Sequence, residues 1–180
     1  MSDLRSFPSA AELVTEMERT IEGGACASPV PWVTLVAELV GSNLEQWELE
    51  DATRDPCATD EEVADAKRGI DRLNIGRHHL VEQIDASVEA GLDQKPDALL
   101  ATESPGMVLD RLSVLVIRRV RTAAASTTQS DFAGRLPELD ARIAALSSAF
   151  DSYVDELQAG TRRFLPYEHF KLYRFGAADD

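Results

Sequence analysis

Apolar residues recur at helical spacing through the first part of the chain. Ser9 precedes a short apolar series and Gly23 follows it, which predicts a first helix with a polar N-cap and a glycine at its end. Residues 25–30 then form a predicted loop. Because proline suits the first turn of a helix, we predict that a second helix begins at Pro31 and runs to about Arg54.

Two longer helices are predicted in the middle of the chain. Thr59 and Glu62 have the spacing of a capping box and open a third helix, which we extend to Gly91. Ser104 and Pro105 open a fourth helix. Its apolar residues lie on nearly every side and are Met107, Val108, Leu109, Leu112, Val114, Leu115, Val116 and Ile117. A helix that is apolar all round belongs in the middle of a bundle.

The last part of the chain predicts one more helix and an aromatic tail. Residues 122–130, TAAASTTQS, indicate a surface connection. Apolar residues then recur at intervals of three and four from Leu136 to Leu157, and Gly160 ends this fifth helix. Residues 162–176 are rich in aromatic side chains, which we expect to pack back onto the bundle. No segment predicts a strand.

The predicted fold is all-α, a single-domain bundle of about five helices with an aromatic C-terminal tail. The domain covers residues 1–180, and we expect residues 1–8 and 176–180 to be flexible. A chain of this length buries a core without a metal or disulfide staple. Cys26 and Cys57 lie in polar stretches and lack the spacing of zinc ligands, so no metal is predicted.

The charge balance restricts the partners of the protein. Eighteen basic and 32 acidic side chains give a formal net charge of −14, spread along the chain. This charge repels nucleic acid and anionic membranes, so we expect neither as a partner. The N-terminal sequence lacks a signal-peptide pattern and no apolar stretch has the length of a membrane span. We therefore expect a cytoplasmic protein.

Polar residues share the apolar stripe of the second predicted helix. The stripe ends in Asp51 and Arg54, and Asn43 and Glu50 lie beside Trp47 at helical spacing. Burying an unpaired charge costs several kcal/mol. These side chains therefore require partners on neighbouring helices.

The next two helices carry similar polar positions. Asp110 and Arg111 interrupt the apolar run of the fourth helix, and Arg77 lies in register with apolar residues of the third. An adjacent polar line on the third helix comprises Lys67, Asp71, Asn74 and His78. This line has the spacing of one helix face.

Two interpretations of these charges compete. In the first, a buried ion-pair network fixes the register of the helices and is formed by Asp110, Arg111, Arg77, Asp51 and Arg54. In the second, the same residues line a pocket between helices, where bundles usually bind ligands. Simple exposure to solvent is the remaining alternative.

Few of these residues suit catalysis. A hard divalent cation, or a pair of acids of different pKa, would use the carboxylates of Glu50, Asp51, Asp71 and Asp110. His78 titrates in the range of a general acid or base, although a lone histidine is more often structural. Phosphate-binding and dinucleotide-binding loops, nucleophile elbows and zinc-protease motifs do not occur in the sequence. The sequence indicates no particular cofactor.

Four blocks of the sequence, in order, resemble a bacterial family, the domain of unknown function 4254. They are residues 43–54 (NLEQWELEDATR), 63–85 (VADAKRGIDRLNIGRHHLVEQID), 104–115 (SPGMVLDRLSVL) and 165–175 (LPYEHFKLYRF). The blocks contain nearly all of the charges described above. The resemblance implies a small helical bundle. Because members often lie beside glycosyltransferase or polysaccharide genes, it also implies a sugar-related or secondary-metabolite biosynthetic setting.

The leading hypothesis is a cytoplasmic bundle whose charged pocket binds a small polar or anionic metabolite. Expected ligand-binding residues are Asn43, Trp47, Glu50, Asp51, Arg54, Lys67, Asn74, Arg77 and Arg111, whose basic members would clamp phosphate or carboxylate. If the protein is an enzyme, the candidates for proton transfer are Asp110, Asp71 and His78. The alternative is a non-catalytic accessory or assembly module whose buried charges are structural. We also expect a homodimer if the aromatic tail leaves the bundle uncovered.

Overall fold

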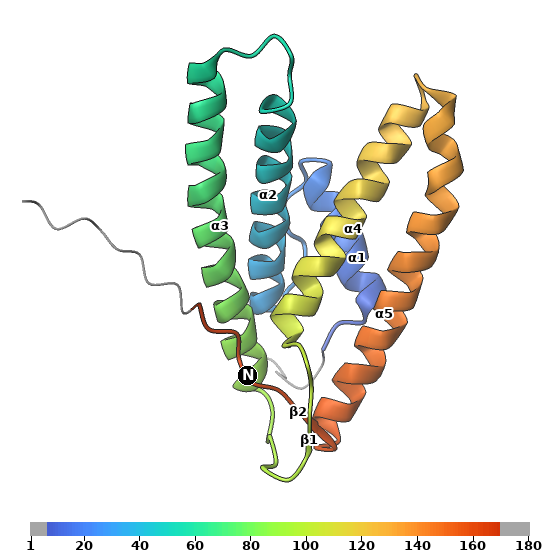
Figure 1. Ribbon diagram of the computed structural model, residues 1–180. Helices are drawn as coiled ribbons and strands as arrows, with labels where there is room; N and C mark the ends of the chain where they lie inside the picture. The colour runs from blue at the N-terminus through green and yellow to red at the C-terminus, as the bar shows by residue number, and fades with distance from the viewer. Residues whose placement is uncertain (1–6, 170–180) are drawn as a thin grey trace, which may run out of the picture.

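The computed structural model describes residues 7–169, which fold into five α-helices, one short 3-10 helix and two very short strands (Figure 1). The helices are α1 (Ala10–Ile21), α2 (Pro31–Ala52), α3 (Asp60–Glu89), α4 (Pro105–Ser126) and α5 (Leu136–Gln158). The 3-10 helix η1 (Ser130–Arg135) joins α4 to α5. Strands β1 (Leu99–Leu100) and β2 (Arg162–Arg163) pair in parallel. The predicted all-α class is confirmed.

Capping boxes fix the starts of α1 and α3. Ser9 pairs with Glu12, and Thr59 pairs with Glu62: each hydroxyl accepts from a backbone N–H in the first turn, and each glutamate accepts from the cap residue. These hydrogen bonds lower the pKa of both glutamates. The capping box predicted at Thr59 is therefore confirmed.

Helix α4 lies at the centre of the bundle and contacts each of the other four α-helices. In Figure 1, α2 and α3 lie on one side of it and α5 on the other. Its buried residues Leu109, Leu112 and Val116 belong to one core cluster. That cluster also contains Leu13 and Met17 of α1, Leu39 of α2, Ile84 of α3 and Phe150 of α5. The all-round apolar pattern of the fourth predicted helix follows from this central position.

Two predictions about the connections are wrong. The predicted surface connection at residues 122–130 is helical as far as Ser126, because the alanines at 123–125 are strong helix formers. No strand is predicted, yet the Ala101 N–H donates to the Arg163 carbonyl at 2.8 Å beside the β1–β2 pair. Strands of two residues are too short to leave a periodic signal, and this pair forms only when two distant segments meet.

The described part of the C-terminal tail packs back onto the bundle. Phe164 is buried in the core, as the aromatic tail was expected to be. Residues 1–6 and 170–180, which include the rest of that tail and most of both predicted flexible ends, lie outside the described residues. At the N-terminal end, Phe7 packs against Trp32 with ring centroids 5.8 Å apart. Aromatic contacts therefore cover the core at both ends of the described chain.

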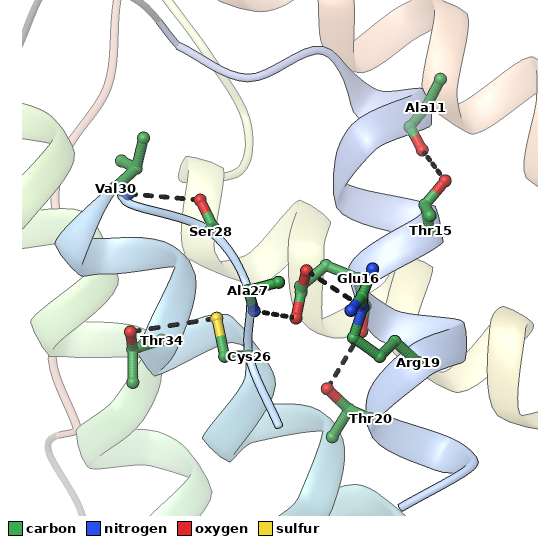
Figure 2. Close-up of polar contacts among 10 residues, drawn as sticks. All are labelled: Ala11, Thr15, Glu16, Arg19, Thr20, Cys26, Ala27, Ser28, Val30 and Thr34. Carbon is green, nitrogen blue, oxygen red and sulfur yellow. Dashed lines mark hydrogen bonds and ion pairs between the residues drawn. The ribbon is translucent and has the colours of Figure 1, made fainter. Parts of the chain in front are cut away.

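Glu16 fixes the loop between α1 and α2, as Figure 2 shows. Its side chain is buried, and its Oε1 accepts a hydrogen bond from the Ala27 N–H at 3.0 Å. Arg19 approaches the other carboxylate oxygen at 3.8 Å. The Ser28 hydroxyl accepts from the Val30 N–H at 3.2 Å, immediately before α2 begins. These contacts hold α1 beside the start of α2.

The buried carboxylate of Asp85 on α3 positions the start of α4. Its Oδ1 accepts from the Gly106 N–H at 2.7 Å, and its Oδ2 accepts from the Tyr167 N–H at 2.8 Å. Burial raises the pKa of Asp85, while hydrogen bonds from the Ser104 side chain and the two N–H groups oppose that rise. A Cβ on Gly106 would lie 2.8 Å from the Val81 carbonyl oxygen, so only glycine allows this approach.

We expect Asp85→Asn to lower the free energy of unfolding by about 2–4 kcal/mol. Asparagine has a single acceptor oxygen and would turn its NH2 group toward one of the two buried N–H donors. Urea denaturation measures the loss, with Asp93→Asn at an exposed loop position as the matched control. Equal stability of the two variants would contradict the anchoring role of Asp85.

Candidate functional site

Three of the predicted site residues meet between α2, α3 and α4. The Asn43 side chain on α2 is buried, and its Nδ2 donates to Asp110 Oδ1 at 2.9 Å and to Ser113 Oγ at 2.8 Å. Arg77 Nη1 on α3 lies 3.7 Å from the second oxygen of Asp110. We call Asn43, Arg77, Asp110 and Ser113 the polar centre.

Three members of the polar centre, Asn43, Asp110 and Ser113, form hydrogen bonds with one another. The Ser113 hydroxyl donates to the Asp110 carbonyl at 2.7 Å, while its oxygen accepts from Asn43. The side chains of Arg77 and Asp110 remain 26% and 21% exposed, so solvent screens their ion pair and limits it to about 1 kcal/mol. The hydrogen bonds of the polar centre therefore link α2 to α4, and α3 joins them only through the ion pair of Arg77. Sequence reasoning missed Ser113, whose signal is its spacing of three residues from Asp110.

The other charges of the predicted network do not join the polar centre. Arg54 pairs with Glu50 at 3.0 Å and with Asp51 at 3.3 Å within one helix end, exposed to solvent. Arg111 pairs with Glu103 at 2.8 Å and is also exposed. Adjacent residues on a helix point about 100° apart, so Arg111 cannot follow the preceding aspartate inward. The prediction of one buried network of five charges is wrong.

The polar line on α3 is solvated over its first part. Lys67 and Asp71 are exposed and Asn74 is half-buried. Within residues 7–169, no group of three or more His, Cys, Asp or Glu side chains could hold a metal ion. The four carboxylates considered from the sequence therefore do not gather into a cation site; they are Glu50, Asp51, Asp71 and Asp110. Asp110 belongs to the polar centre, whereas Glu50 and Asp51 lie at the end of α2.

His78 ends the polar line and contacts the C-terminal segment. Its Nδ1 lies 2.7 Å from the Tyr167 hydroxyl, and its ring stacks on that of His169 with centroids 4.2 Å apart. Burial lowers the pKa of His78, the nearby His169 and Arg77 lower it further, and two nearby carboxylates oppose this. These effects together favour the neutral form of the imidazole. It is half-buried beneath the C-terminal segment.

A separate open cleft of about 1080 Å³ lies between the C-terminal half of α2 and the hairpin of α4, η1 and α5. Helix α2 and the hairpin of α4 and α5 diverge from one another toward the top of Figure 1. The charged residues that line the cleft are Glu48, Asp51, Arg118, Arg121, Arg135, Glu138 and Arg142. The large apolar side chains that line it are Trp47, Leu115, Phe132 and Leu139. We call this site the arginine cleft.

Two of the four arginines in the cleft have carboxylate partners. Arg121 on α4 pairs with Glu48 on α2, and this ion pair links the two sides of the cleft. Arg142 pairs with Glu138 at 2.7 Å, one turn away on α5. Asp51, the third acid in the lining, is engaged by Arg54 outside the cleft. The acids of the lining therefore leave some of its positive charge unbalanced.

The other two arginines carry that unbalanced charge. Within the described residues, neither Arg118 nor Arg135 forms an ion pair. The Arg135 guanidinium carbon lies 5.5 Å from the centre of the Phe132 ring, a cation–π arrangement. Both guanidinium groups belong to the lining of the cleft and have hydrogen-bond donors available for a ligand.

The sequence pattern predicted only some of the residues that line the arginine cleft. Trp47 and Asp51 line the cleft, but none of the predicted basic clamp residues does so. Arg118 and Arg121 follow the apolar run of the fourth helix, so the sequence pattern indicates only the polar end of that helix. Their proximity to Arg135 depends on the turn at η1, which no sequence period reveals. The available signal is the run RRVR at residues 118–121 in a strongly acidic chain.

These features define an all-α bundle with a cationic cleft and a polar centre whose hydrogen bonds are formed among its own residues. The chain belongs to the DUF4254 family of proteins of unknown function, which matches residues 33–165. This range contains the polar centre and the whole lining of the cleft, whereas Tyr167 and His169 lie beyond it. No curated protein and no solved structure matches the chain. None of the helices within residues 7–169 has the length and apolar character needed to cross a membrane.

We expect Asn43→Ala to lower the free energy of unfolding by about 2–3 kcal/mol, because the buried Ser113 and the partly buried Asp110 both lose their donor. Asn43→Asp should cost more, because its carboxylate would face Asp110. Urea denaturation measures both, with Asn74→Ala on the half-buried line of α3 as the control. If Asn43→Ala were as stable as that control, the polar centre would not fix the helices.

Proposed function

We propose that this protein binds a small metabolite with two negative charges, such as a phosphate ester, in the arginine cleft. The observation that carries the proposal is the pair Arg118 and Arg135, two cations without carboxylate partners among the described residues, in one cleft of a chain with net charge −14. A strongly acidic protein has many carboxylates available to pair with arginine. Unpaired arginines that gather in a cleft are therefore typical of an anion site.

The two unpaired arginines of the cleft support a dianion. The lining has four arginines and three acids, and Asp51 among these is engaged by Arg54 outside the lining. The ion pairs of Arg121 with Glu48 and of Arg142 with Glu138 leave two arginines without a carboxylate partner. Guanidinium groups bind phosphate and carboxylate through paired, charge-assisted hydrogen bonds. A ligand with two negative charges could pair with both of these arginines.

The apolar lining supports a ligand that also has an uncharged body. Trp47 and Phe132 offer aromatic surface, and Leu115 and Leu139 offer aliphatic surface. Small-molecule sites commonly combine such walls with a few polar groups that fix the orientation of the ligand. The catalytic candidates Asp110, Asp71 and His78 do not line the cleft. The proposed activity is therefore binding.

The proposal places this binding in the bacterial cytoplasm, in a sugar-related or secondary-metabolite biosynthetic pathway. Only the family resemblance supports that setting. It makes sugar phosphates and nucleotide sugars the first ligands to test.

A thermal-shift screen with glucose 1-phosphate, a nucleotide sugar, inorganic phosphate and neutral glucose tests the proposal. At about 100 times its dissociation constant, a ligand should raise the melting temperature by about 5–10 °C. We expect this shift for a phosphate-bearing ligand, its loss in the double variant Arg118→Ala/Arg135→Ala, and no shift with glucose.

The matched control for this experiment is Arg111→Ala, which removes an exposed arginine outside the cleft. This variant should keep the full ligand response. A shift that survives in the double variant, or that disappears equally in Arg111→Ala, would argue against the arginine cleft as the site.

A non-catalytic accessory or assembly module is the second candidate. The polar centre supports it, because Asn43, Asp110 and Ser113 are already satisfied by one another. Such a module predicts a stable wild-type protein that responds to none of the ligands. It also predicts that Asp110→Asn changes stability alone.

The proposal also includes a homodimer. Leu99 in β1 and Leu165, two residues after β2, are 69% and 64% exposed, so the described part of the chain leaves both uncovered. Large apolar side chains in such positions favour burial against a second copy. We expect Leu99→Ser/Leu165→Ser to convert a dimer to a monomer in sedimentation. A wild-type protein that sediments as a 19.7 kDa monomer would contradict the dimer.

A further inference from the structure

The last described segment of the chain lies along α3 (Figure 1). We call residues 164–169 the C-terminal strap. The Phe164 N–H donates to Gln94 Oε1 at 2.7 Å, and the Tyr167 N–H donates to a carboxylate of α3 at 2.8 Å. The His169 N–H donates to Glu82 Oε1 at 2.8 Å. Phe164 is buried, so the strap has a fixed inner end and a more exposed outer end.

An aromatic stack holds the outer end of the strap. The His78 ring of α3 contacts two strap residues: its centroid is 5.5 Å from that of Tyr167 and 4.2 Å from that of His169. The interplanar angles are 13° and 21°, so both strap rings lie nearly parallel to the His78 ring. The Tyr167 hydroxyl also lies 2.7 Å from His78 Nδ1. Two imidazole rings are thus in direct contact across the boundary between strap and helix.

Protonation changes each of these contacts. The neighbouring His169 imidazole opposes a positive charge on the His78 ring. A neutral His78 with its proton on Nε2 accepts the Tyr167 hydroxyl, and a protonated ring has no acceptor to offer. Of the surrounding charges, Arg77 also opposes protonation of this ring. Those that favour protonation are Glu82 on α3 and Asp110 on α4.

The balance of these groups disfavours the charged ring. Burial, His169 and Arg77 together lower the pKa of His78 despite the two carboxylates. A lowered pKa in the folded state means that the contribution of the ring to folding is present above about pH 6.5. That contribution is lost as the pH falls through the folded pKa. Glu82, whose own pKa is lowered, remains ionised in that range and does not cause the change.

We propose that the contacts of His78 with Tyr167 and His169 form a pH-sensitive latch, which holds the C-terminal strap on α3 while the His78 ring is neutral and releases the outer end of the strap when that ring is protonated. This inference does not depend on ligand binding in the arginine cleft. The strap and the cleft share no residue. The latch would make the surface of α3 around His78 accessible under acidic conditions.

Hydrogen–deuterium exchange of the full-length protein tests the latch. Backbone protection in residues 164–169, corrected for the intrinsic pH dependence of exchange, is compared between about pH 8 and about pH 5.5. We expect the wild-type protein to lose protection by about tenfold or more at the lower pH. His78→Gln should remove this pH dependence, because glutamine does not titrate.

The matched control is His79→Gln, because His79 is exposed and pairs with Glu82 without joining the stack. This variant should keep the wild-type pH dependence. Equal wild-type protection at both pH values would overturn the proposal. So would a pH dependence that persists in His78→Gln and disappears in His79→Gln.

If His78→Gln loses protection already at the higher pH, the latch is tested on the wild-type protein alone. NMR titration then follows the His78 ring and the amides of Tyr167 and His169. A shared midpoint for ring and amides supports the latch. Separate midpoints overturn it, because a release caused by His78 must follow its protonation.

Discussion

The carboxylate of Asp85 is the contact on which the arrangement of α3, α4 and the C-terminal strap depends. A central helix must begin somewhere in the core, and its first N–H groups have no partners within the helix. Asp85 accepts the Gly106 N–H at that point and the Tyr167 N–H from the far end of the chain. Because Gly106 lacks a Cβ, α3 and α4 come close enough for this bond. One buried acid thus joins segments that are distant in sequence.

The polar centre and the arginine cleft use the same kinds of side chain to opposite effect. In the polar centre, Asn43 and Ser113 are buried and their hydrogen bonds are made with one another and with Asp110. Such a network specifies register and leaves little for a ligand to bind. In the cleft, Arg118 and Arg135 have no carboxylate partner among the described residues. The two sites therefore differ in whether each polar group already has a partner within the protein, and not in the charge of that group.

The position of the cleft would account for the proposed binding of an anion by an acidic protein. Solvent and salt screen the field of distant surface charges within about 8–10 Å, so nearby groups dominate inside a cleft. Four arginines from α4, η1 and α5 therefore outweigh a net charge of −14 locally. The strap lies on α3 and attaches there through backbone donors and aromatic stacking. The proposed anion binding and the proposed strap release thus rest on different groups of the same bundle.

The sequence by itself determined the class of the fold and most of its helices, because helical periodicity and capping boxes such as Thr59 with Glu62 are local properties. It also marked Asn43, Arg77 and Asp110 as residues that need partners, because a polar group on an apolar stripe must be satisfied. Only the tertiary structure decided which partners they have, that Arg54 and Arg111 remain in solvent, and that Arg118 meets Arg135 across a turn. Those outcomes depend on helix rotation and on contacts between distant segments, which no local pattern encodes.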